Sequence, residues 1–255
     1  MRISLPILVH KEHRLRTGVL IFGAAAILYL TSNQFHIFRP RLLPLSRIDI
    51  AVPFVPLTVW LYVSEFVYAV VIYCSFRDTV NLNKCVYAVF SLLVTCVLVF
   101  WLWPTAFLRD LFPLPANLDP VTLAVFTALR RADSPSNCFP SFHVGSVFLA
   151  CFILSNESRR KFLFFLVWAT AISLSTLTAK QHYFVDVVSG FSLAIIFYFV
   201  FRRARFQGLA QVVLMIAMVG MVLNIFPFRR TSQDDPALPA IAQRSSACPA
   251  LDENL

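Results

Sequence analysis

The sequence has 255 residues, of which 58% are hydrophobic and only 14% are charged. This composition excludes an ordinary soluble domain, in which about 25% of residues are charged. The net charge of +9 is dispersed over the ends of apolar runs instead of being gathered in one domain, which argues against a nucleic-acid-binding protein.

The apolar residues fall into runs close to the roughly 20 residues that a helix needs to cross a bilayer. Seven runs are predicted to be membrane helices: 17–38, 51–76, 85–103, 140–155, 162–179, 184–201 and 209–226. The first is modest because its unbroken apolar stretch, 19–30, is short, and the fourth and sixth are weakened by His143 and Asp186. The predicted fold is therefore all-α, a polytopic membrane bundle with six or seven transmembrane helices.

Three regions are expected along the chain. Residues 1–16 are basic and lack the small-residue cleavage site of a signal peptide, so they are predicted to be a cytoplasmic flank. Residues 17–228 form the transmembrane domain. Residues 229–255, rich in Pro, Ala, Ser and Asp without periodicity, are predicted to be disordered.

The basic clusters indicate an orientation, because they fall in alternate connections and basic loops tend to stay cytoplasmic. The clusters are Lys11, Arg14 and Arg16; Arg77 and Lys84; Arg159, Arg160 and Lys161; and Arg202, Arg203 and Arg205. The connections after the third and fifth runs then face outward. Three arginines on the proposed outer side count against this orientation: Arg39, Arg41 and Arg47.

The connection 104–137 is the longest in the chain. It contains Asp119-Pro120, a typical helix start, followed by an apolar stretch, 121–129, that ends in Arg130 and Arg131. We expect a short helix at the membrane surface, serving as a lid or a plug. The two arginines are expected to contact lipid headgroups.

Ionisable residues enter the apolar sequence at two places. Lys180, His182 and Asp186 lie at the start of the sixth run, where Asp186 is expected to orient the His182 ring from four residues away. His143 lies at the start of the fourth run, two residues after Ser141, a good helix N-cap. Alone, each histidine could be an ordinary interfacial residue, but the two motifs together favour a catalytic site.

The remaining polar and sulfur-containing residues point to no other site. The six cysteines lack disulfide spacing, and no CxxC or HxxxH pair predicts a zinc site. Glu65, inside the second run, is interpreted either as a substrate contact or as a helix-pairing carboxylic acid.

These motifs resemble those of the type-2 phosphatidic acid phosphatase superfamily, which includes vanadium haloperoxidases. The superfamily's Pro-Ser-x-His motif matches residues 140–143, and its Ser-Arg-x5-His-x3-Asp motif matches residues 175–186 with Thr176 in place of Arg. The Phe-Pro-Ser-x-His string is more similar to the inositol phosphorylceramide synthase-like branch. The resemblance covers about residues 104–190.

The resemblance implies catalytic roles for His182, His143 and Asp186. It also implies substrate binding by Ser141, Ser175 and Thr176. The superfamily's first motif, Lys-x6-Arg-Pro, is not found ahead of the second, so other cations are expected to hold phosphate, with Lys180 and Arg109 preferred. No metal or other cofactor is implied.

The implied chemistry is transfer of a phosphoryl group through a phosphohistidine-type intermediate. The expected substrate is a membrane phospholipid or lipid phosphate, and the active site is expected on the exoplasmic (periplasmic or lumenal) face. The acceptor is either water or a hydroxyl group of inositol, ceramide or diacylglycerol. The alternative function is a lipid transporter or proton-coupled transporter that performs no chemistry.

Overall fold

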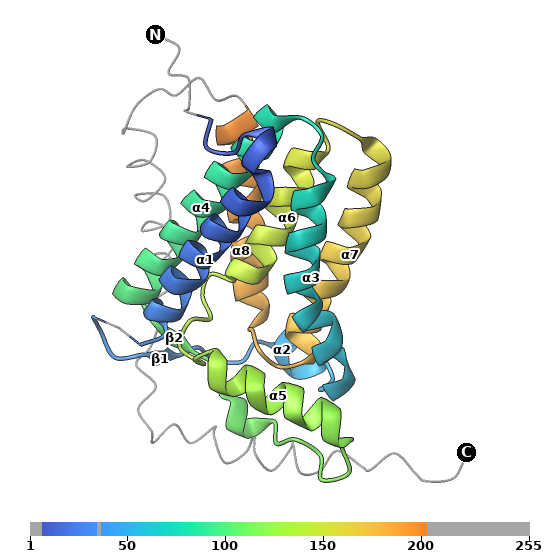
Figure 1. The fold of residues 1–255 in the computed structure, drawn as a ribbon. Coiled ribbons are helices and arrows are strands. Elements are labelled where there is room, and N and C mark those ends of the chain that lie inside the picture. Colours follow the sequence, from blue (N-terminus) through green and yellow to red (C-terminus); the bar gives the residue numbers. More distant parts are fainter. Residues whose placement is uncertain (1–6, 35–36, 203–255) are drawn as a thin grey trace.

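Long apolar helices run side by side in one bundle in the computed structural model, which describes residues 7–34 and 37–202 (Figure 1). Five helical segments in these residues are long and apolar enough to cross a membrane. Their α-helices are α1 (Arg14–Ser32), α3 (Val59–Ser75), α4 (Thr79–Leu102), α7 (Arg159–Thr178) and α8 (Phe184–Arg202). Turns of 3-10 helix extend two of them: η1 (Lys11–His13) before α1 and η2 (Pro56–Thr58) before α3. The predicted all-α membrane bundle is confirmed.

The fourth predicted span is a shorter helix at the centre of the bundle, α6 (Phe142–Leu154). Its 13 residues extend about 20 Å at 1.5 Å per residue, less than the roughly 30 Å of a bilayer core. Residues such as Val144 and Leu149 are fully buried, because α6 packs against α4, α7 and α8. The predicted span 209–226 and the predicted disordered tail 229–255 lie outside the described residues.

A close approach between α6 and α8 fixes the centre of the bundle. A Cβ atom added to Gly190 would collide with the carbonyl oxygen of Ser141 and lie 3.3 Å from the amide nitrogen of Gly145. At the same place the Ser141 N–H donates to the Asp186 carbonyl at 3.1 Å. Glycine at position 190 therefore allows the backbones that carry Ser141 and Asp186 to touch.

Gly190→Ala is expected to destabilise the fold, because overpacking a tight core costs about 1–3 kcal/mol and the obstacle here is backbone. The thermal melting midpoint of the purified protein in detergent should fall, and activity should fall with it. Gly23→Ala is the matched control, since a Cβ atom there meets nothing within 4 Å. Equal melting midpoints for the two variants would contradict the close-approach interpretation.

One end of the bundle is covered by the long connection between α4 and α6 (Figure 1). Its main element is α5 (Pro120–Ala132), which begins where Asp119 accepts N–H bonds from Val121 at 3.1 Å and Thr122 at 2.9 Å. The predicted short helix is thus present, with one residue more at its start and three more at its end; its place at the membrane surface stays a prediction. The short helix η3 (Arg109–Leu111) lies in the same connection.

A two-stranded parallel sheet ties the connection to an earlier part of the chain. Strand β1 (Arg41–Leu42) pairs with β2 (Thr105–Ala106), and Thr105 also bridges to Asn137. Helix α2 (Arg47–Ala51) follows β1, and Val55 donates its N–H to the carbonyl of Thr178 at 2.9 Å. The predicted second span began at residue 51, but residues 52–55 are in a connection that lies against the end of α7.

Candidate active site

His182 lies in the short turn that joins α7 to α8. Lys180 has a φ of 53°, in the left-handed region, and so reverses the chain just after α7 ends. The His182 N–H then donates to the carbonyl of Thr176 at 3.2 Å. His182 therefore precedes α8, which begins at Phe184, instead of sharing a helical face with Asp186 as the sequence predicted.

The predicted contact between His182 and Asp186 is nevertheless present. Nδ1 of His182 lies 3.4 Å from Oδ2 of Asp186 and 3.2 Å from the carbonyl oxygen of Cys138. The same Asp186 oxygen accepts the N–H of Tyr183 at 2.8 Å. Both acceptors face one ring nitrogen, so they favour a proton on Nδ1 and leave Nε2 with its lone pair.

The second motif, residues 140–143, meets the third motif at Nε2 of His182. Ser141 caps α6 by accepting the N–H of Val144 at 3.3 Å, and its Oγ lies 3.4 Å from Nε2 of His182, although the two residues are 41 positions apart. His143 follows in the first turn of α6, with its ring centroid 5.8 Å from that of His182. The structure thus brings His143, His182, Asp186 and Ser141 into one cluster, in which His143 is half-buried and the other three residues are buried.

Helix α3 supplies two partners for His143. Nε2 of His143 lies 3.3 Å from Oε2 of Glu65 and 3.1 Å from the hydroxyl of Tyr62. The other carboxylate oxygen of Glu65, Oε1, accepts the hydroxyl of Ser146 at 3.0 Å. Glu65, for which the sequence left two roles open, is therefore paired with a histidine of the site. Tyr62 was missed; its only signal was its position three residues before Glu65 in the same apolar run.

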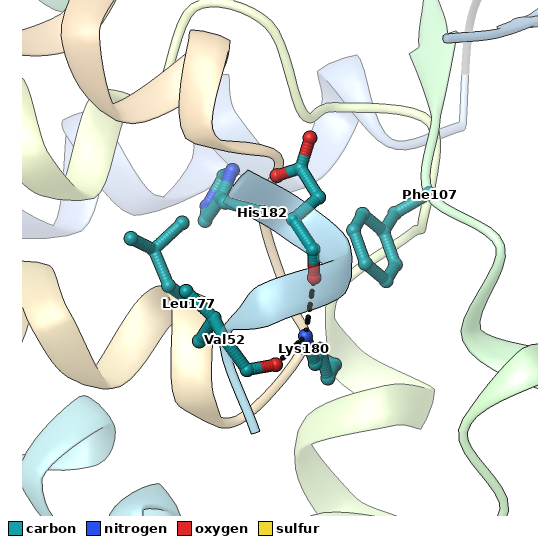
Figure 2. A pocket seen from close by; sticks show the side chains of 6 residues that line it. Val52, Phe107, Leu177, Lys180 and His182 are labelled. Carbon is teal, nitrogen blue, oxygen red and sulfur yellow. Dashed lines mark hydrogen bonds between the residues drawn. The ribbon is translucent and has the colours of Figure 1, made fainter. Parts of the chain in front are cut away.

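Lys180 lines a pocket together with His182 (Figure 2). Its ammonium group donates to the carbonyls of Asp49 at 2.8 Å and Val52 at 2.5 Å, and lies 4.8 Å from the ring centroid of Phe112. Burial lowers the pKa of Lys180 from the ordinary lysine value, and the charge of Asp49 opposes this shift. The cation preferred from the sequence is thus beside the site but held by backbone carbonyls.

Arg109, the other preferred cation, is also buried and is held by Asp133. One guanidinium nitrogen donates to the Asp133 carbonyl at 2.7 Å, and another lies 3.5 Å from its carboxylate. The same carboxylate accepts the hydroxyl of Tyr29 at 2.9 Å, and the Tyr29 ring meets the His143 ring edge-on at 6.0 Å. Arg109 is therefore linked to the site through Asp133 and Tyr29.

The two remaining residues of the third motif use their side chains within α7. The hydroxyl of Ser175 donates to the Ile172 carbonyl at 2.6 Å, and that of Thr176 donates to the Ser173 carbonyl at 2.7 Å. Both residues are buried, and the carbonyl of Thr176 holds the His182 N–H. In this arrangement Thr176 supports the turn through its backbone.

Helix α2, which was not predicted from the sequence, is hydrogen-bonded to the turn that carries His182. The Asp49 carboxylate accepts the N–H of Phe184 at 2.6 Å, while its other oxygen accepts the N–H of Ser46 at 2.8 Å. The only signal in the sequence was the Ser46-x-x-Asp49 spacing of a helix capping box, which the structure contains. Asp49 and Lys180 therefore join α2 to both sides of His182.

Asp49→Ala is expected to lower kcat by about 10-fold to 100-fold, since small misplacements of reacting groups have effects of that size, and to change KM less. Asp49→Asn should recover part of the loss, because its amide oxygen still accepts the Phe184 N–H. Asp78→Ala is the control: Asp78 is exposed and caps the start of α4 by accepting the Val80 N–H, and α4 starts at the end of the bundle away from α5 (Figure 1). Equal steady-state kinetics for Asp49→Ala and Asp78→Ala would contradict a positioning role.

One group of possible metal ligands occurs among the described residues: Cys138, His182 and Asp186, whose ligand atoms lie within 4.8 Å of one another. All three residues are buried. Any cation held there would share His182 with the histidine cluster.

A model of the PAP2 superfamily matches residues 57–200, more than half of the chain. The match contains Ser141, His143, His182 and Asp186 together with Glu65, and it does not include Asp49. Comparisons with curated proteins and with solved structures each gave no match.

Proposed function

This chain belongs to the PAP2 superfamily of phosphatase-type lipid enzymes, and from that premise we propose that it transfers a phosphoryl group from a membrane lipid through a covalent intermediate on His182. The observation that carries the proposal is the environment of the His182 ring. Its Nδ1 faces Asp186 at 3.4 Å, and its Nε2 faces Ser141 at 3.4 Å with the second histidine ring 5.8 Å away.

In the first step, the lone pair on Nε2 of His182 forms a bond to phosphorus, and the bond from phosphorus to the leaving oxygen breaks. The ring then carries a positive charge, which the carboxylate of Asp186 stabilises through the Nδ1 proton. Asp186 is fully buried, and electrostatic stabilisation of this kind is strongest where water is scarce.

His143 is proposed to protonate the leaving oxygen and then to take a proton from the incoming acceptor. Its Nε2 faces Glu65 and Tyr62, whereas Nδ1 has no hydrogen-bond partner among the described residues, so we assign Nδ1 to the leaving oxygen. The carboxylate of Glu65, 3.3 Å from Nε2, holds the His143 ring in position for this transfer.

The non-bridging phosphate oxygens are proposed to bind the Ser141 hydroxyl and the cations Lys180 and Arg109, with Ser175 and Thr176 supporting the His182 turn. Lys180 shares a pocket with His182 (Figure 2), and an arriving phosphate would compete with the two backbone carbonyls for its ammonium group. A buried ammonium gains more from an anionic partner than an exposed one.

For the acceptor, we propose a hydroxyl compound instead of water alone, as in the synthase-like branch that the sequence resembles. Phe142 adds bulk beside His143, and the connection with α5 covers this end of the bundle (Figure 1). Both features would limit access of water to the intermediate. The site is proposed to face the exoplasmic side, since the basic clusters lie mainly at the other end of the described bundle.

The proposal is tested by incubating the purified protein with a panel of labelled phospholipids and lipid phosphates, with and without inositol, ceramide or diacylglycerol. We expect a new phosphodiester or phosphorylated product that depends on one acceptor. Free phosphate alone, released at a rate indifferent to every acceptor, would reject transfer and leave a lipid phosphatase. No product from any donor would reject the enzymatic proposal.

A further inference from the structure

We propose that Cys138, His182 and Asp186 form a binding site for a thiophilic divalent cation such as Zn²⁺, and that its occupation inhibits the enzyme. Metal binding follows from the geometry of the three side chains alone. Inhibition rests in addition on the proposed nucleophilic role of His182.

The three ligands come from two connections and the first turn of α8. Cys138 lies ahead of α6, 44 residues before His182, so no short sequence spacing could reveal the set. Their ligand atoms are all within 4.8 Å of one another. Sulfur, nitrogen and oxygen ligands on one zinc ion lie roughly 3–4 Å apart, so small side-chain movements suffice.

An unsatisfied carboxylate oxygen points to a missing partner at this place. Asp186 is fully buried, and its Oδ1 has no hydrogen-bond partner among the described residues, whereas Oδ2 accepts the Tyr183 N–H. The Cys138 thiol is a weak donor whose nearest acceptor is the Pro135 carbonyl at 2.9 Å. A cation would satisfy Oδ1, in exchange for the weak thiol hydrogen bond and for the contacts of the Nδ1 proton at 3.2 and 3.4 Å.

The donor set selects the kind of cation. Thiolate, imidazole and carboxylate together suit Zn²⁺ and other borderline or soft ions. Mg²⁺ and Ca²⁺ require mainly oxygen ligands and are disfavoured. On binding, the Cys138 thiol releases its proton to solvent and the sulfur forms the bond to the metal, so the site becomes occupied without any redox change.

Occupation would oppose the proposed reaction at the His182 ring. The nitrogen nearest Asp186 is Nδ1, and a cation bound there displaces the Nδ1 proton. The neutral ring then carries its proton on Nε2, so Nε2 loses the lone pair that the proposed reaction needs for attack on phosphorus. Turnover should therefore fall as the site fills.

Binding is measured directly by titrating metal-free, full-length protein with Co²⁺. We expect a thiolate-to-cobalt charge-transfer band at one equivalent, displaced by Zn²⁺. The band should be lost in Cys138→Ser and Cys138→Ala, with folding checked by thermal melting. It should persist in Cys74→Ser, the matched control, because Cys74 is exposed and far from the site in sequence. Absence of the band in the wild type, or its persistence in both Cys138 variants, would overturn the site.

Inhibition is measured on the same proteins. Zn²⁺ should inhibit the wild type and Cys74→Ser, with activity restored by EDTA, and Cys138→Ser should need at least a tenfold higher Zn²⁺ concentration. A Cys138-dependent cobalt band without any effect of Zn²⁺ on turnover would overturn the inhibitory role alone. The same band in a protein that acts on no lipid donor would instead overturn the proposed function and leave the metal site standing.

Discussion

His182→Ala should reduce turnover by about 10⁶-fold, to the detection limit, because it removes the atom that attacks phosphorus. Asp186→Asn should reduce turnover by about 10⁴-fold, since it removes charge support and ring orientation but leaves the nucleophile. Both variants are measured with the same lipid donor under saturating conditions. Thermal melting midpoints establish that the fold is retained.

His13→Ala is the matched control for the nucleophile. His13 is exposed and directly precedes α1, which starts at the end of the bundle away from α5 (Figure 1), and the mechanism assigns it no role. Its variant should keep wild-type turnover. Wild-type turnover in His182→Ala as well would contradict the proposed mechanism, and so would a larger loss for Asp186→Asn than for His182→Ala.

The second large effect is expected at His143. His143→Ala should lower turnover of a lipid donor by about 10²-fold to 10⁴-fold, the usual contribution of general acid–base catalysis. The loss should be much smaller with a donor whose leaving group is a stable anion, such as a nitrophenolate, because that oxygen departs without a proton. Comparing the two donors separates proton transfer from structural damage.

Glu65→Gln should show the same dependence on the leaving group with a smaller loss, because Glu65 acts through the His143 ring at 3.3 Å. Glu157→Gln is the control, since the Glu157 carboxylate accepts the N–H groups of Arg77 and Asp78, away from the histidine cluster. An equal loss of turnover with both donors in Glu65→Gln would contradict its assignment to proton transfer.

Much of the fold could be predicted because the bilayer constrains the sequence so strongly. Runs of apolar residues mark the long helices, with boundaries that shift where the chain turns before or after a span. The short helix α5 was predictable from Asp119, Pro120 and the two terminal arginines. Helix α6 is the exception in length, since hydropathy reports burial and does not distinguish a lipid-facing helix from one enclosed by protein.

The pairing of His182 with Asp186 was predictable from a four-residue spacing, but not its geometry. The left-handed turn at Lys180 lifts His182 off the helix, and a positive φ at a lysine has no sequence signal. The partners of Lys180 also come from α2 and from the residue that follows it, more than 120 residues earlier. Contacts of that range depend on how the helices pack, which one sequence does not reveal.

The partners of His143 illustrate the same limit. Glu65 was visible as a charge inside an apolar run, and its cost in a membrane indicated some function. Which group Glu65 serves depended on the packing of α3 against α6, which brings Glu65 next to His143 and next to Ser146, 81 positions away in the sequence. The proximity of Cys138 to His182 was likewise not predictable, because 44 residues separate them in the sequence.

The central claim is that His182 carries the phosphoryl group, and trapping that species tests it most directly. A phosphorus-labelled lipid donor is mixed with the purified protein, the reaction is quenched under alkaline conditions within the first turnover, and the labelled residue is mapped by mass spectrometry. We predict acid-labile label on His182, approaching one equivalent and absent in His182→Ala. Stable label on another residue, or turnover with unlabelled His182 at every quench time, would contradict the account.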